Sequence, residues 1–278
     1  MAITVNTNIP SLTAQHSLNA ATNKMNTAME RMSTGLRINS SKDDAAGMAV
    51  SNKLDYKVSS LAVAQDNAQM GASMLDTMEG VMGVINDNLT RIRDLTEQAA
   101  NGTYGSDAIA AIKTEINSRL NEINRVANSA EFNGKKLLNG DTSSVSLQVG
   151  INNDSYSTIT LDSSVFQNST KTGLGFDEND ITYTTAAQFK GFLGTVDEAI
   201  KRVTDAKTAI GGKQAAITSA MESAQVMATN LTSASSLIKD ADIAEESSNY
   251  IKQQILQQTS ASLLATANQA PSIALNLV

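Results

Sequence analysis

The sequence predicts a mainly α-helical fold, in which long helices bundle into an antiparallel coiled-coil rod with a small β-hairpin excursion. Two long stretches place apolar residues in alternating steps of four and three, which is the spacing of a coiled-coil seam. Composition agrees, because 41% of the residues are hydrophobic while only 4% are aromatic and none is Trp. Ala, Leu, Ile, Val and eleven Met supply the apolar content, a mixture that favours helices packed side by side.

Each end of the chain is expected to form an amphipathic helix. Residues 12–34 carry apolar side chains every three or four positions, at Leu18, Ala21, Met25, Ala28 and Met32. Residues 237–270 repeat the pattern at Ile243, Ile251, Ile255, Leu256, Leu263 and Leu264. Neither helix can form a core alone, so each needs a partner. We therefore expect both ends to be disordered in the monomer and to fold when copies of the chain assemble.

A first long helix is predicted over residues 45–100. Its apolar seam continues for seven heptads, and only Lys57 and Thr96 place polar side chains on it. The motif Ser41-x-x-Asp44 resembles a capping box, so we expect it to open this helix.

A second long helix and a shorter one share this pattern. Residues 193–238 keep one register, at Leu193, Val196, Ile200, Val203, Lys207, Ile210, Gln214, Ile217, Met221, Ala224, Ala228, Leu231, Ser235 and Ile238. The shorter stripe consists of Ile109, Ile112, Ile116, Leu120 and Ile123. Three helices should therefore bundle, and a local bend is expected where Gly211 and Gly212 interrupt the last one.

Residues 141–187 differ in character from the helical stretches. Apolar and polar residues alternate over 145–149 and again over 159–161, which predicts a β-hairpin. Residues 162–187 are rich in Ser, Thr, Asn and Gly. We expect that stretch to be an exposed surface excursion, with one further strand near residues 181–183.

Charge and cysteine content exclude several classes of function. The net charge of −7 makes binding to nucleic acid or to an anionic membrane unfavourable. The sequence has no Cys, which excludes disulfides, thiolate metal sites and cysteine catalysis.

The sequence contains no stretch of 18 apolar residues, so it predicts no membrane span. The opening MAITVNTNIP lacks the basic and apolar regions of a Sec signal peptide, so we expect any export to use another route.

Candidate catalytic groups are few. His16 is the only histidine, and no partner for catalysis or metal binding is apparent near it in the sequence. The pairs Asp43-Asp44 and Glu245-Glu246 could in principle supply carboxylates for acid–base or metal chemistry. Both pairs stand where helices are expected to begin, and there capping and the helix dipole account for them. We predict no catalytic residue, no metal and no cofactor.

Three segments resemble bacterial flagellin. Residues 32–54, MSTGLRINSSKDDAAGMAVSNKL, resemble the N-terminal signature of the flagellin family. Residues 120–140, LNEINRVANSAEFNGKKLLNG, resemble the stretch that precedes the hairpin in flagellins. The C-terminal tail of the family is similar to residues 238–278, IKDADIAEESSNYIKQQILQQTSASLLATANQAPSIALNLV. With the opening ITVNTNIPSLTAQHSLN, the resemblance covers residues 1–140 and 190–278.

The resemblance implies a short flagellin with little or no outer variable domain. Residues 1–44 and 236–278 would pair as the inner terminal coiled-coil domain, and residues 45–235 would form the rod domain. Such a protein is a structural subunit of the bacterial flagellar filament and self-assembles into a helical polymer for motility. It would be exported unfolded through the flagellar type III channel and would act outside the cell, without a cleaved signal peptide.

The resemblance also implies partners. Other copies would be contacted through Leu18, Met25, Met32, Ile243, Ile251, Ile255, Leu256, Leu263 and Leu264. An export chaperone would bind the C-terminal tail, and filament cap and hook-junction proteins would meet the ends of the polymer. A vertebrate toll-like receptor, part of innate immune recognition, would bind the monomer at Arg91, Leu95, Gln98 and Glu115.

Two other structural classes share part of this pattern. A hook–filament junction protein has similar terminal helices but caps a junction in few copies. A chemoreceptor cytoplasmic rod has the heptads without the hairpin, and it usually has a transmembrane segment.

Overall fold

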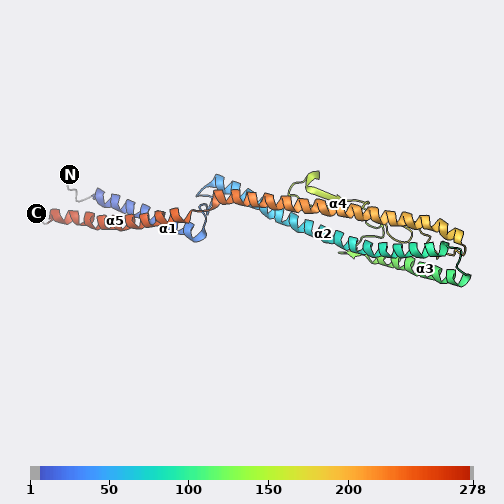
Figure 1. The fold of residues 1–278 in the computed structure, drawn as a ribbon. Coiled ribbons are helices and arrows are strands. Elements are labelled where there is room, and N and C mark those ends of the chain that lie inside the picture. Colours follow the sequence, from blue (N-terminus) through green and yellow to red (C-terminus); the bar gives the residue numbers. More distant parts are fainter. Residues whose placement is uncertain (1–6, 276–278) are drawn as a thin grey trace. The chain divides into compact units, whose positions relative to one another are not determined.

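The computed structural model describes residues 7–275, and its elements are mainly helices (Figure 1). The helices are α1 (Ile9–Thr34), α2 (Ala45–Ala100), α3 (Ser106–Ser129), α4 (Ala186–Lys239) and α5 (Ile243–Leu275). The strands are β1 (Glu131–Phe132), β2 (Lys135–Lys136), β3 (Val145–Gln148) and β4 (Thr158–Leu161), and the short 3-10 helix η1 (Ser155–Ser157) precedes β4. The predicted fold class is thus confirmed. Among the described helices, none has the length and hydropathy needed to cross a membrane.

The chain forms two compact units. The rod unit consists of residues 57–229, and the terminal unit consists of the residues up to Tyr56 together with those from Asn230 onward. The division therefore falls inside α2 and α4. The domain bounds implied by the flagellin resemblance, at residues 44 and 236, stay a prediction. Parts of that predicted terminal domain, residues 1–6 and 276–278, lie outside the described residues.

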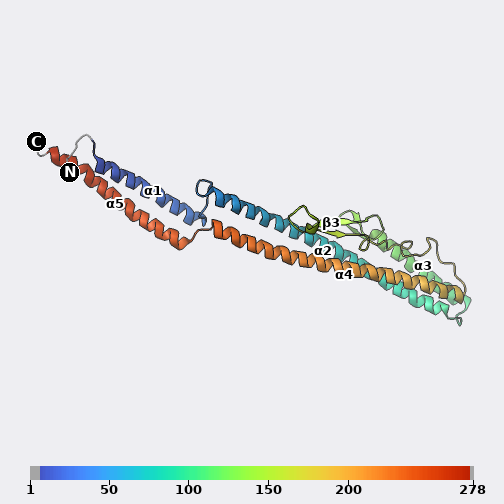
Figure 2. The same cartoon turned by 90° about the horizontal axis from the view of Figure 1, so that it is seen from above.

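The rod unit is built on the three predicted seams, with α2, α3 and α4 packed side by side (Figure 2). Every predicted seam position of α2 from Leu61 to Ala99 is buried, and so is each residue of the predicted α3 stripe. Val196, Val203, Ile210 and Ile217 of α4 complete this core. The helix α4 continues through Gly211 and Gly212, because the helical backbone tolerates glycine when neighbouring side chains are buried.

The start of α2 corrects the predicted capping box. Oδ1 of Asp44 accepts a hydrogen bond from the backbone N–H of Gly47 at 2.8 Å, so Asp44 caps the helix. The Ser41 hydroxyl donates instead to the Met48 sulfur at 3.5 Å. The predicted start of the helix is right and the predicted capping residue is wrong, because the aspartate already satisfies the free N–H group.

The predicted β-hairpin is confirmed and lies against α2. Strands β3 and β4 pair antiparallel, with Leu147 opposite Ile159. Leu147 packs directly over Gly71, where an added Cβ atom would lie 2.3 Å from the Cδ1 atom of Leu147. The missing side chain of Gly71 therefore makes room for the hairpin.

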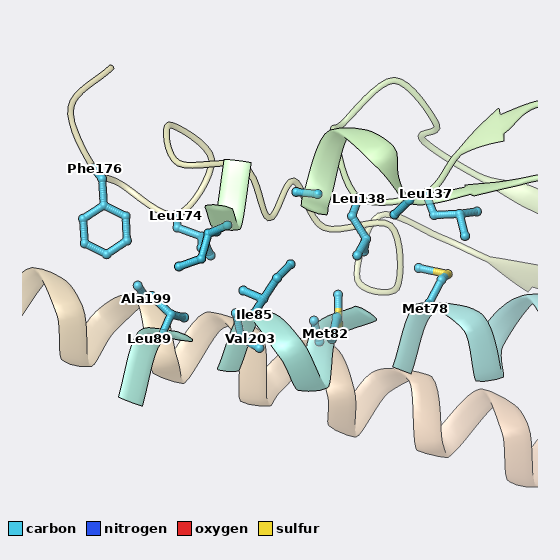
Figure 3. Packing of buried hydrophobic residues seen from close by; sticks show 14 of the residues in the cluster. Met78, Met82, Ile85, Leu89, Leu137, Leu138, Leu174, Phe176, Ala199 and Val203 are labelled. Atoms are coloured by element: carbon cyan, nitrogen blue, oxygen red, sulfur yellow. The ribbon is translucent and has the colours of Figure 1, made fainter. Parts of the chain in front are cut away.

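Residues 162–185 contradict the predicted exposed excursion. Phe166, Leu174 and Phe176 are buried, and Figure 3 shows the last two pointing toward the helices near Leu89. This segment, which we call the strap, completes the core of the rod unit. The prediction was wrong because the abundant Ser, Thr, Asn and Gly residues indicated an exposed segment, although a few well-spaced apolar side chains in it are buried.

Polar contacts of Lys171 and Asn117 help to hold the strap in place. The Lys171 ammonium is buried and donates to the carbonyl oxygens of Glu178 at 3.1 Å and Asn179 at 3.0 Å. The side-chain amide of Asn117 donates to the Ile181 carbonyl at 3.3 Å and accepts from the Ile181 N–H at 2.9 Å. The strand expected near residues 181–183 is absent from the described structure, because this side chain takes the place of a partner strand.

Substitution of Lys171 by Met should loosen the strap. The variant keeps most of the buried volume but leaves two carbonyl groups without a donor, which should lower the free energy of unfolding by about 1–3 kcal/mol. Hydrogen exchange should become faster over residues 171–181, as measured by mass spectrometry. The exposed Lys190→Met variant on α4 should behave as the unsubstituted chain does, and equal exchange in the two variants would contradict the proposed role of Lys171.

Candidate self-assembly interface

In the terminal unit, α1 and α5 lie side by side and run antiparallel (Figure 2). The less exposed positions of α1 follow a spacing of three and four, at Ser11, Ala14, Leu18, Ala21, Met25, Ala28 and Met32. Those of α5 follow the same spacing, at Glu246, Tyr250, Gln253, Gln257, Ser260, Leu264 and Ala267. The two sets form the seam between the helices.

The predicted assembly residues of α1 pack against α5 of the same chain. Leu18, Met25 and Met32 are half-buried in the seam, and the small side chains of Ala21 and Ala28 are buried beside them. Small residues at alternate seam positions let the two backbones approach closely. The apolar stripe of α1 is therefore largely covered by α5.

Four large apolar residues of α5 lie outside the seam. Ile251, Ile255 and Leu263 are 51%, 57% and 58% exposed, and Leu256 is exposed as well. Successive helical residues are about 100° apart, so Ile251 and Ile255 face away from α1, whereas Leu256 and Leu263 lie beside the seam and are still exposed. We call these four residues the α5 stripe. Of the remaining predicted residues, Ile243 is exposed near the start of α5, and only Leu264 belongs to the seam.

The surface along the α5 stripe is slightly hollowed. An open hollow of about 440 Å³ is lined by Ser248, Ile251, Lys252, Ile255 and Leu256. Its apolar walls lack a partner among the described residues, which makes this surface a candidate for contact with another molecule.

Polar contacts set the register of the seam. The Arg31 guanidinium donates to Oε1 of Glu246 at 2.9 Å, with both side chains largely shielded from water. Further hydrogen bonds join Gln257 to Thr22 at 3.0 Å, Asn8 to the Ala267 carbonyl at 2.8 Å and Ser11 to Asn268 at 2.7 Å. Sequence analysis missed these partners, because no pattern within one helix predicts a contact 215 residues away. Such contacts favour one alignment while contributing little hydrophobic stabilisation.

The segment between α1 and α2 is tied to the end of α4. Gly35 ends α1 with a positive φ of 72°, and its carbonyl accepts from the Ala241 N–H at 2.9 Å. The Arg37 N–H donates to the Lys239 carbonyl at 2.7 Å. The Asp55 carboxylate accepts from the Ser235 hydroxyl at 2.7 Å and from the Lys239 ammonium at 3.2 Å. These bonds, above all the one from Ser235, lower the pKa of Asp55 below its ordinary value.

The four receptor candidates lie in the rod unit and separate into two groups. Nε of Arg91 donates to Oε1 of Glu115 at 3.1 Å, and both side chains are accessible. Gln98 is exposed and donates to the Tyr104 hydroxyl at 2.9 Å. Leu95 is only 3% exposed and belongs to the core, so it is not available on the surface of the chain.

The paired carboxylates have structural partners. The Asp43 carboxylate accepts from the hydroxyl and the N–H of Ser40, both at 2.9 Å, which lowers the pKa of Asp43. Asp44 caps α2, and Glu246 pairs with Arg31. Within residues 7–275, no three His, Cys, Asp or Glu side chains gather in a way that could hold a metal ion.

The bundled helices of the rod unit and the exposed α5 stripe are typical of a helical structural protein. Two family models match the chain, the bacterial flagellin N-terminal helical region over residues 5–143 and the flagellin C-terminal helical region over residues 193–278. The chain belongs to the bacterial flagellin family. Flagellins are structural subunits of the bacterial flagellum, an extracellular filament built from their copies that serves motility, and this chain is such a subunit.

Two relatives that match in sequence over the whole length agree with this assignment. A flagellin of Xenorhabdus nematophila is 35% identical over 317 aligned residues that cover all of both chains. A flagellin of Halalkalibacterium halodurans is 34% identical over 99% of both chains. The crystal structure of Bacillus cereus flagellin aligns with a TM-score of 0.49 and 25% identity, over 61% of this chain and 94% of that one.

Acidification should open the contact between α2 and the end of α4. Because the pKa of folded Asp55 lies below its ordinary value of 3.8, its contribution to stability is present above that value and is lost as pH falls through the folded pKa. Hydrogen exchange over residues 235–239, corrected for intrinsic rates, should rise as the pH falls below 3.8. The Asp55→Asn variant should show a much smaller rise, whereas Asp66→Asn should follow the unsubstituted chain. Equal pH dependence in all three proteins would refute the role of Asp55.

Proposed function

We propose that the α5 stripe is the surface through which copies of this chain join into the filament. The observation that carries the proposal is the outward orientation of Ile251, Ile255 and Leu263, each more than half exposed. Covering an Ile or Leu side chain contributes about 1.5–3 kcal/mol, so a few such contacts suffice for association. Contacts between the stripe and a different surface of the next copy are heterologous, and repeating them generates an open helical polymer.

We further propose that the α1–α5 pairing becomes stable only in the filament. The large apolar side chains of the seam, Leu18, Met25, Met32 and Leu264, are only half-buried. Long helices with so little buried apolar surface are marginal in water. Neighbouring copies that cover the α5 stripe would add the missing stabilisation, which supports folding of the terminal domain on assembly.

Export follows from the same argument. Before assembly the α5 stripe would be open to unwanted association, so we propose that an export chaperone covers the C-terminal tail inside the cell. The chain then leaves unfolded through the flagellar type III channel. Filament cap and hook-junction proteins meet the terminal helices of the first and last subunits. Membership of the flagellin family supports each of these steps.

Recognition of the monomer by a vertebrate toll-like receptor is a further proposed role. It rests on the resemblance to flagellins and on the accessible ion pair between Arg91 and Glu115, with Gln98 exposed on the same helix as Arg91. Leu95 would act from within the core, by holding α2 in place beneath these side chains.

Substitution of Ile255 by Ser should impair filament growth. Losing about 1.5–3 kcal/mol of burial at each contact should raise the critical concentration for seeded growth about tenfold to hundredfold, as measured by sedimentation and electron microscopy. The matched control is Gln254→Ser, an exposed position outside both the stripe and the seam, which should grow normally. Normal filament growth of the Ile255→Ser variant would contradict the proposed role of the α5 stripe in joining copies of the chain. Failure of the unsubstituted chain to grow long filaments would instead favour a hook–filament junction protein.

Substitution of Arg91 by Ala should weaken receptor activation by the monomer. Removal of one charge-assisted contact should raise the half-maximal dose in reporter cells about tenfold. Arg125→Ala removes a more exposed arginine of the rod unit and should leave the dose unchanged. Equal doses for the two variants would contradict the proposed receptor surface.

A further inference from the structure

The tip of the β3–β4 hairpin presents an aromatic side chain to solvent. Tyr156, in η1, is 95% exposed, whereas Tyr183 packs against the rings of Phe189 and Phe192. Burial of aromatic rings contributes strongly to packing, and only 4% of this chain is aromatic. The ring of Tyr156 is therefore fully available for a contact with another molecule.

The backbone around this ring is held in place. The Gln148 side chain donates to the carbonyl oxygens of Gly150 at 2.8 Å and Asn152 at 3.0 Å. Oδ1 of Asp154 accepts from the Ser157 N–H at 2.8 Å. A loop that is already ordered loses little conformational entropy when it binds, so it is well suited to act as a docking element.

The hairpin is also attached firmly to the rod unit. Leu147 fills the space above Gly71, and the Asn67 side chain donates to the Gln148 carbonyl at 3.3 Å. A force on a contact at the tip is therefore transmitted to α2 through packed side chains.

The composition of the tip favours a second copy of this chain as its partner. Residues 150–157 contain Gly, Ile, Asn, Ser and Tyr with a single charged residue, Asp154, which accepts an internal hydrogen bond. Each copy carries a net charge of −7, so copies repel one another where their charges meet. A nearly uncharged tip can approach another copy without that repulsion. Tyr, Ser, Gly and Asn are also the residues that recognition loops use most.

We propose that the hairpin tip, residues 150–157, docks onto a second copy of this chain in the filament, with Tyr156 as its anchor. This proposal rests on the proposed filament function and adds to it a contact made by the rod unit. The contact is heterologous, because the ring meets a different surface of the neighbouring copy, and it is therefore compatible with an open polymer.

The first test uses the absence of cysteine in the chain. A Tyr156→Cys variant carries a unique thiol, and it is copolymerised with an excess of the unsubstituted chain. Maleimide should label this thiol rapidly in the free subunit and at least about tenfold more slowly in the filament, which corresponds to burial in most copies. Equal labelling rates in the two states would overturn the proposal while leaving the filament function intact. Failure of the unsubstituted chain to polymerise would instead count against the filament function.

A second test separates the ring from the loop. Tyr156→Ser removes the ring and should raise the critical concentration for seeded growth about tenfold, the effect of losing about 1.4 kcal/mol. Tyr156→Phe keeps the ring and should grow nearly as the unsubstituted chain does. Because the side chain is 95% exposed, these variants should fold normally, which circular dichroism of the free subunit checks. Unimpaired growth of Tyr156→Ser would overturn the proposal.

Discussion

The apolar surface of α5 exceeds what a single partner helix can cover, and the proposed self-assembly of this protein depends on that constraint. One helix covers one side of its neighbour, and α1 meets the side of α5 that carries Gln253, Gln257 and Ser260. Ile251 and Ile255 remain in solvent on the other side. Polar contacts fix which side faces α1, and the apolar side is left for other molecules. A subunit that is incomplete in this way becomes complete in a polymer.

The rod unit meets the opposite requirement, because it is complete without a partner. Three helical seams and the strap bury one continuous core, and the side chains of buried Lys171 and half-buried Asn117 satisfy backbone groups of the strap. A unit with its own core can carry load, and in the proposed filament the terminal unit would join the copies. The exposed ring of Tyr156 is the exception, and it stands on the hairpin that the core holds in place.

Sequence periodicity predicted most of the fold but little of what each face contacts. The seam of α2 could be read directly, because residues such as Met78, Met82 and Leu89 keep the heptad spacing and face one core. The apolar stripes of α1 and α5 look alike in sequence, yet the stripe of α1 packs against α5 while the stripe of α5 is exposed to solvent. Periodicity shows that a helix has an apolar side without showing which molecule covers it. The strap was predicted wrongly because its average composition is polar, although a few buried apolar side chains anchor it.

A cryo-electron microscopy map of the filament grown from the unsubstituted chain tests the central claim most directly. The account predicts that α1 and α5 keep their polar seam in each subunit, with Arg31 beside Glu246. It also predicts that Ile251, Ile255 and Leu263 pack against other copies. A map in which these three side chains face solvent, or turn inward to contact α1 of the same subunit, would contradict it.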